Sequence, residues 1–214
     1  ALIGVCMAGS MTLLSTLVLA HGGQEVGATD ATILMDHSHH MAMVAAADNG
    51  GIQRSLRTYP AIPDLVLIDA EGRPVRLREL LAEGGPVMLN FIFTTCTTIC
   101  PVMSKVFADV RTQLGHETDK LRMVSISIDP ENDTPAQLKA YAQKFGANLD
   151  WTLLTGSVQN VAEVQRAFDA YDSDKMNHKP LTLLRIAPGD AWVRIDGFAT
   201  AGQLAGEFRN TLAP

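Results

Sequence analysis

Apolar residues run almost without interruption from Val87 to Phe93, and this run predicts a strand that is buried on both faces. Two further strand patterns follow at residues 121–128 and 151–154. Between and after these strands, apolar residues recur with helical spacing and stop at glycine or proline. The helices predicted in this way cover residues 102–114, 134–145, 157–170 and 200–212.

Two hairpin patterns frame this alternation of strands and helices. The first is predicted at residues 64–77, with a turn that contains Gly72, and the second at residues 181–195. This order predicts an α/β sandwich with a central mixed sheet flanked by helices, and with the first hairpin as an N-terminal extension. A cysteine pair, Cys96 and Cys100, follows the first buried strand, which is typical of a thioredoxin-like arrangement.

The N-terminal part of the chain has a different pattern. Residues 1–20 carry no charge, and residues 11–20 resemble the apolar core of a secretory signal. Small residues before His21 resemble a cleavage site, yet the segment is also long enough for a membrane anchor. A buried core helix is a third interpretation. The first two predict a periplasmic or other extracytoplasmic protein, secreted or anchored to the inner membrane.

Residues 21–58 predict a flexible linker, because they are rich in Gly, Ala and Asp and lack aromatic residues. The thioredoxin-like domain is therefore expected at residues 59–214. The linker contains imidazole and thioether side chains, and both bind copper ions. These candidates for auxiliary metal capture are His37, His39, His40, Met41 and Met43. The alternative is a solvated tail in which these residues have no role.

The composition narrows the classes of partner. With a formal net charge of −6, the protein lacks the basic balance that phosphate contacts require, so we exclude nucleic acid as a partner. Three cysteines do not indicate a disulfide-stapled scaffold. One of them, Cys6, lies in the N-terminal apolar segment, which leaves a single pair for the folded domain.

The single pair lies where the central strand ends and a helix begins. Pro101 suits the first turn of that helix, and backbone N–H groups at a helix start stabilise a thiolate. Positions i and i+4 face the same side of a helical turn, so Cys96 and Cys100 suit either a soft metal ion or a disulfide. The usual redox spacing has two intervening residues, whereas three separate these cysteines.

A soft ion held by two thiolates commonly takes imidazole as a third ligand. Downstream of the pair, the available histidines are His116 and His178. His116 follows a predicted helix end and is interpreted as an ordinary surface residue. His178 lies in a loop directly before a strand, where α/β proteins place their sites. Spacing alone leaves His178 as either a ligand or an ordinary loop residue.

Three segments together resemble the Sco/SenC family. The members of this family are copper chaperones for cytochrome c oxidase, and the chaperones have a thioredoxin-like fold. Residues 91–101, FIFTTCTTICP, resemble the CxxxCP segment of that family, and residues 127–135, SIDPENDTP, resemble its DPxxDTP signature. Asn177 and His178 before an apolar strand resemble its histidine loop. The loop departs from the common Val-Asp-His, since Met176 precedes Asn177 here.

The resemblance implies that Cys96, Cys100 and His178 bind copper, as Cu(I) and Cu(II), and that Asp133 supports the site. It also implies a partner, the copper-receiving subunit of a respiratory oxidase. The alternative function is an extracytoplasmic thiol–disulfide oxidoreductase or a peroxiredoxin-like enzyme. In that case Cys96 is the attacking thiolate, Cys100 resolves the mixed disulfide, and a thiol reductant is the partner.

Overall fold

The computed structural model describes residues 51–60, 62–147 and 150–212. The predicted signal or anchor at residues 1–20 and the auxiliary metal-binding candidates at residues 37–43 lie outside the described residues, so both stay predictions. Within the described part of the chain, no helix combines the length and the apolar character needed to cross a bilayer.

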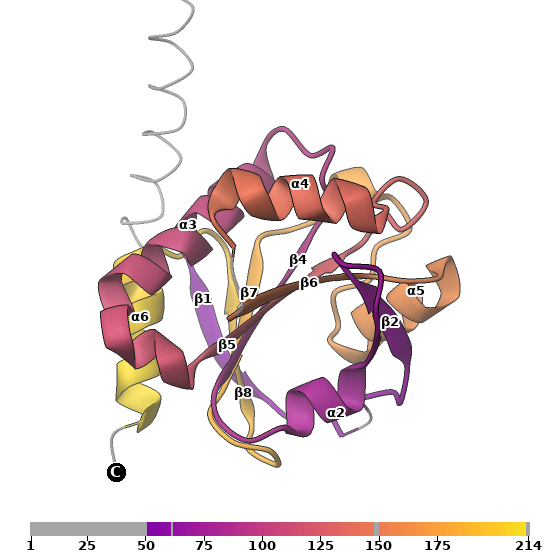
Figure 1. The fold of residues 1–214 in the computed structure, drawn as a ribbon. Helices are drawn as coiled ribbons and strands as arrows, with labels where there is room; N and C mark the ends of the chain where they lie inside the picture. Colours follow the sequence, from indigo (N-terminus) through magenta and orange to yellow (C-terminus); the bar gives the residue numbers. More distant parts are fainter. Residues whose placement is uncertain (1–50, 61, 148–149, 213–214) are drawn as a thin grey trace, which may run out of the picture.

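An eight-stranded mixed sheet forms the centre of the domain, with the strand order β1-β8-β7-β4-β5-β6-β2-β3 (Figure 1). The parallel pairs are β4 with β5 and β5 with β6, and the remaining neighbours are antiparallel. The strands are β1 (Gln53–Arg57), β2 (Val66–Asp69), β3 (Pro74–Arg76), β4 (Val87–Ile92), β5 (Arg122–Ser127), β6 (Trp151–Thr155), β7 (Leu181–Arg185) and β8 (Trp192–Asp196). The predicted α/β sandwich and both predicted hairpins, β2–β3 and β7–β8, are confirmed.

Strand β4 is buried along its whole length, as its apolar run predicts. Alternate side chains serve opposite faces of the sheet. Met88 and Ile92 pack into one hydrophobic core, and Leu89 and Phe91 into the other. Because both faces of β4 need cover, the sheet becomes the middle layer of a three-layer domain.

Helices α3 (Ile99–Leu114), α4 (Pro135–Phe145) and α6 (Ala201–Leu212) bury their apolar faces on one side of the sheet. Helices α2 (Leu77–Ala82) and α5 (Val158–Ala167) cover the other side (Figure 1). Two short 3-10 helices, η1 (Gly115–Lys120) and η2 (Lys175–Asn177), complete the domain. Helix α4 begins as its sequence predicts, since the Thr134 hydroxyl accepts a hydrogen bond from Gln137 N at 3.3 Å.

Strand β1 lies in the range that the sequence pattern assigned to the linker. It pairs antiparallel with β8, and Arg54 forms an ion pair with Glu207 of α6 at 2.6 Å. The folded domain therefore begins before residue 59. The sequence did not indicate this strand because it is an edge strand with mostly exposed side chains, so it lacks an alternating apolar pattern.

Parallel pairing positions the candidate site. Strands β4 and β5 run in the same direction, so their carboxyl ends meet at one edge of the sheet. The loop after β4 and the first turn of α3 carry the cysteines, and the loop after β5 carries the acidic signature. A hydrogen bond from Ile128 N to Ile92 O, at 2.8 Å, joins the two loops where they leave the sheet.

Candidate metal centre

The Cys loop, residues 93–98, connects β4 to α3. Cys96 lies in this loop, and Cys100 is the second residue of α3, so the two cysteines do not share one helical turn as predicted. Cys96 N donates to Phe93 O at 3.2 Å, which turns the chain sharply before the helix. Both thiols are free; Cys96 is partly exposed, whereas Cys100 is fully buried.

The surroundings of Cys96 favour its thiolate. Its sulfur accepts a hydrogen bond from Cys100 N at 3.3 Å and lies 3.8 Å from the Thr98 hydroxyl oxygen. Burial by itself raises the pKa of Cys96, but hydrogen bonds from Cys100 and Thr98 outweigh burial and hold the pKa below its ordinary value. Cys96 is therefore the reactive, accessible member of the pair.

The surroundings of Cys100 have the opposite effect. Burial raises the pKa of the Cys100 thiol far above its ordinary value, and the nearby Cys96 and Asp133 raise the pKa further. A hydrogen bond from Phe93 N to the Cys100 sulfur, at 3.4 Å, offsets only part of this effect. In the absence of a bound cation, Cys100 is thus a neutral thiol at physiological pH.

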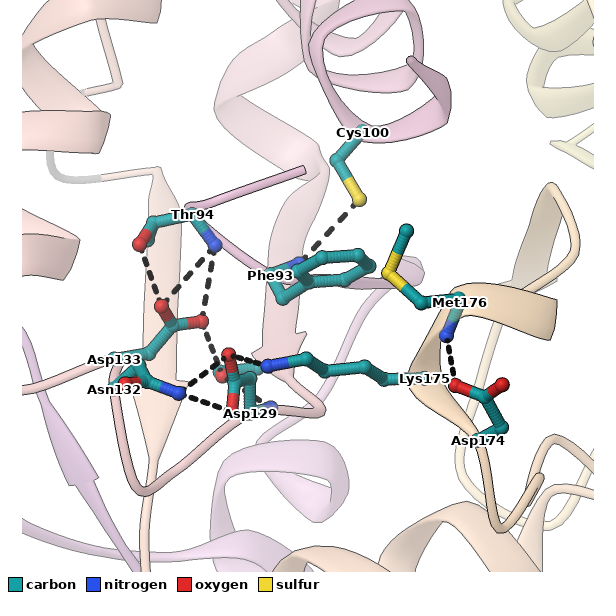
Figure 2. Close-up of polar contacts among 10 residues, drawn as sticks. Phe93, Thr94, Cys100, Asp129, Asn132, Asp133, Asp174, Lys175 and Met176 are labelled. Carbon is teal, nitrogen blue, oxygen red and sulfur yellow. Dashed lines mark hydrogen bonds and ion pairs between the residues drawn. The ribbon is translucent and has the colours of Figure 1, made fainter. Parts of the chain in front are cut away.

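Asp133 fixes the start of the Cys loop (Figure 2). Its buried carboxylate accepts hydrogen bonds from the Thr94 hydroxyl at 2.5 Å, from Thr94 N at 3.1 Å and from the Ser127 hydroxyl at 2.6 Å. The carboxylate therefore joins the ends of β4 and β5. The supporting role expected for Asp133 stays a prediction; its contacts with Thr94 and Ser127 were not predicted from the sequence.

The His loop, residues 174–180, includes η2 and precedes β7. Lys175 Nζ forms an ion pair with Asp129 Oδ2 at 2.6 Å, and the Asp129 carboxylate also accepts hydrogen bonds from Asn132 Nδ2 at 2.9 and 3.0 Å (Figure 2). Lys175 Nζ lies 5.7 Å from the centre of the Phe93 ring. These contacts hold the His loop against both the acidic loop and the Cys loop.

His178 lies at the sheet but is not assembled with the cysteines. Its side chain is buried, and Nε2 is 3.0 Å from Phe91 O. Because a carbonyl oxygen can only accept, Nε2 carries the hydrogen and Nδ1 keeps the lone pair. Burial lowers the pKa of His178, so the ring is neutral at pH 7. Across residues 51–60, 62–147 and 150–212, no three His, Cys, Asp or Glu side chains form a group that could hold a metal ion.

The donor set nevertheless fits a soft metal ion in part. Two sulfurs, one with a stabilised thiolate, lie at the strand end and suit Cu(I). Lys175 was missed by sequence reasoning, although a lysine two residues before Asn177 and an acidic signature loop were both visible. Which of several carboxylates the lysine meets depends on the tertiary fold.

Comparison with known proteins gives the family. A family model described as SCO1/SenC matches residues 53–210. The SCO1 protein homolog of Bacillus subtilis is 40% identical over 94 residues, which cover 44% of this chain and 48% of the relative. The chain spans about half the length of the curated relatives it matches, and these include mitochondrial proteins.

Solved structures agree with the family model. ScoI of Bradyrhizobium japonicum with copper bound is 26% identical, with a TM-score of 0.59 over 70% of this chain and 99% of that chain. BsSco, a member of the Sco family of cytochrome c oxidase assembly proteins in which a disulfide switch was identified, is 28% identical, with a TM-score of 0.58 over 69% of this chain and 91% of that chain. The predicted thioredoxin-like fold is confirmed. The chain belongs to the SCO1/SenC family.

Proposed function

We propose that this protein binds copper through Cys96 and Cys100 and delivers it to the copper-receiving subunit of a respiratory oxidase. The observation that carries the proposal is the pair of free thiols at the end of the central strand, with a stabilised thiolate at Cys96. Thiolates select soft Cu(I) over harder ions. The copper-bound relative and the oxidase-assembly relative support this function.

His178 is proposed as the third ligand when the centre holds Cu(II), because imidazole is a harder donor than a thiolate and suits Cu(II). Its position beside the carboxyl end of β4 supports this role. Coordination through Nε2 requires release of Phe91 O, whereas coordination through Nδ1 leaves that hydrogen bond intact and keeps it as an orienting contact. Asp133 supports the centre by holding the Cys loop and does not bind the metal itself, since its carboxylate already accepts from Thr94 and Ser127.

Copper binding releases the Cys100 proton, because a thiol must deprotonate to become a ligand. The raised pKa of Cys100 makes this step unfavourable at low pH, so copper affinity is expected to fall as pH decreases. Delivery then requires an exchange of these sulfurs for donor groups on the recipient. The oxidase subunit is the proposed recipient.

The test is a copper titration of the reduced protein with matched variants. The parent is expected to bind one equivalent tightly and to show a sulfur-to-copper charge-transfer band with Cu(II). Cys96→Ser and Cys100→Ser are each expected to lose the band, and His178→Ala is expected to weaken Cu(II) binding by about 10- to 100-fold. Unchanged Cu(II) binding by His178→Ala would exclude the three-ligand site. Full copper binding by both serine variants would exclude the copper function.

A second candidate function, thiol–disulfide exchange, is favoured by the unlike pKa values of the two thiols. The Cys96 thiolate would attack a partner disulfide and release one partner thiolate; Cys100, once deprotonated, would then displace the second and form the Cys96–Cys100 disulfide. Turnover with a dithiol reductant that is lost in Cys96→Ser and unaffected in His178→Ala would support this activity. Absence of turnover in the parent would exclude it.

The linker residues 37–43 are proposed to raise the local copper concentration near the domain. Deletion of residues 35–43 is expected to remove the copper that the protein binds beyond the first equivalent. Unchanged stoichiometry would exclude this role.

We also propose an extracytoplasmic location, with residues 1–20 as a signal or membrane anchor. Protease added to cells with an intact or a permeabilised outer membrane tests the location. Digestion of the domain after the outer membrane is permeabilised is expected, and a domain that stays undigested would contradict the proposal.

A further inference from the structure

The His loop borders the buried thiol through two contacts on the end of β4. Lys175 Nζ lies 5.7 Å from the centre of the Phe93 ring, and His178 Nε2 lies 3.0 Å from Phe91 O. Phe93 N in turn donates to the Cys100 sulfur at 3.4 Å. The two anchors of the His loop therefore flank the backbone segment against which Cys100 packs.

Met176 lies between these two anchors in the sequence, and it is 72% exposed. The other methionines of the described chain, Met88, Met103 and Met123, are at most 2% exposed. A side chain of this size is usually buried, because its burial is favourable by roughly 1.5–3 kcal/mol. Among the described methionines, Met176 is thus the one whose thioether is open to a metal ion.

The side chain of Met176 extends toward the cysteine end of the site. Figure 2 shows its sulfur and terminal methyl group directed from η2 toward Phe93 and Cys100, away from Asp174. The backbone beneath it is held, since Met176 N donates to the Asp174 carboxylate at 2.9 Å and Asn177 N donates to Asp174 O at 2.9 Å. The side chain has three rotatable bonds that can adjust its sulfur position above this fixed backbone.

Thioether sulfur is a soft, neutral donor that needs no deprotonation, and it suits Cu(I) better than Cu(II). Imidazole is the harder donor, and the Nε2 atom of His178 already bonds to Phe91 O. Binding of Cu(I) by three sulfurs leaves that hydrogen bond unbroken and, unlike coordination through Nδ1, does not involve the imidazole ring. The His loop therefore offers different donors to the two oxidation states of copper, the Met176 thioether to Cu(I) and the His178 imidazole to Cu(II).

We propose that Met176 supplies a thioether ligand to Cu(I) held by Cys96 and Cys100, so that Cu(I) has an all-sulfur site that does not require His178. This inference rests on the proposed copper function. It assigns the two candidate third ligands to different oxidation states, with Met176 for Cu(I) and His178 for Cu(II).

Selenomethionine labelling tests the contact directly. The labelled, reduced full chain is loaded with one equivalent of Cu(I), and X-ray absorption at the copper edge detects selenium beside copper. We expect copper–selenium scattering in the parent and in the matched control Met123→Leu, which removes a buried methionine, and its loss in Met176→Leu. Competition with a Cu(I) chelator is expected to show at least about tenfold weaker Cu(I) retention for Met176→Leu. His178→Ala is expected to retain Cu(I) like the parent.

The outcomes separate this inference from the copper function. Cu(I) retained by the parent without copper–selenium scattering overturns the role of Met176 and leaves the copper function standing. Scattering that persists in Met176→Leu assigns the contact to another methionine and also overturns it. A parent that binds no Cu(I) overturns both. Because Met176 is exposed, Met176→Leu is expected to unfold at the same urea concentration as the parent, so lost scattering is not attributable to misfolding.

Discussion

The Cys loop and the His loop are held in different ways. The Cys loop leaves a strand that is buried along its whole length, and the buried carboxylate of Asp133 fixes its second residue, Thr94, through backbone and side-chain hydrogen bonds. The His loop includes the three-residue η2, and two side chains hold it near the cysteines, Lys175 through Asp129 of the acidic loop and His178 through Phe91 O of β4. A backbone hydrogen bond from Gly197 N to Pro180 O, at 2.9 Å, holds its far end.

This difference predicts that the two loops respond differently when a metal ion binds. A loop fixed by a buried carboxylate keeps its geometry when a metal ion arrives, because movement would leave buried donors unpaired. A loop attached by a half-exposed lysine and one ring nitrogen can shift at a smaller cost. We therefore expect the cysteines to be the preorganised part of the centre and the His loop to be the part that adjusts to the oxidation state of the metal.

The largest expected effect is the loss of the Cys loop anchor. Asp133→Ala leaves the Thr94 and Ser127 donors without their acceptor in a buried site, and we expect the free energy of unfolding to fall by about 3 kcal/mol. Urea unfolding measures this change. Glu131→Ala, an exposed residue of the same loop, is the control, with an expected change within about 0.5 kcal/mol. Equal effects of the two variants would contradict the anchoring role of Asp133.

Release of the His loop is expected to have a smaller and more local effect. Lys175→Met removes the ion pair with Asp129, whose carboxylate is 5% exposed but keeps its hydrogen bonds from Asn132, so the expected cost is about 1–2 kcal/mol. Amide hydrogen exchange at Asn177 and His178 should accelerate by up to about fivefold, while exchange in β4 is unchanged. Lys179→Met, which removes an exposed lysine of the same loop, should leave these rates unchanged. The role of the ion pair fails if the two variants behave alike.

The pH dependence of alkylation sharpens the comparison within the cysteine pair. The lowered pKa of Cys96 means that its thiolate forms at lower pH than an ordinary thiol, so its modification by iodoacetamide should reach half-maximal rate at a lower pH than that of a cysteine in an unstructured peptide. Cys100 should stay unmodified over the same range, because its thiol is buried and its pKa is raised. Mass spectrometry of peptides gives both profiles, and Thr98→Val should move the Cys96 profile to higher pH. Faster modification of Cys100 than of Cys96 would reverse the assignment.

The smallest expected effect is a pH dependence of stability from His178. Burial lowers its pKa in the native state, so the unfolded chain takes up the proton first as pH falls through about 6.5. Stability is therefore complete above that pH and decreases as pH falls from it toward the native pKa. Urea unfolding between about pH 7.5 and pH 5 measures the slope. His178→Ala should have a shallower slope than the parent, and an identical slope would show that His178 is not the group responsible.

The sequence predicted the parts of the site that depend on local patterns. The continuous apolar run predicted β4, and Pro101 predicted that α3 begins nearby. The position of the cysteines at a strand end was therefore predictable. The capping residue Thr134 likewise predicted the start of α4. The loop geometry was less predictable, because Cys96 N bonds to Phe93 O and keeps Cys96 outside the helical turn.

The parts that were not predictable depend on contacts between residues far apart in the sequence. Lys175 and Asp129 are 46 positions apart, and nothing in either segment specifies their pairing. His178 bonds to Phe91 O, 87 positions away, so its spacing from the cysteines could not predict its orientation. Strand β1 was missed for a related reason, since its backbone pairing with β8 imposes no apolar pattern on its side chains.

If copper is delivered to another protein as proposed, the unequal burial of the two sulfurs sets the order in which they release it. Cys96 is partly exposed, whereas Cys100 is buried with 0% exposure. An incoming donor group would therefore reach the metal ion on the side of Cys96 first, and the bond from the metal ion to Cys100 would be the last to break. The proposed transfer would then pass through an intermediate in which both proteins bind the metal ion, and the lifetime of that intermediate would depend on the bond to Cys100.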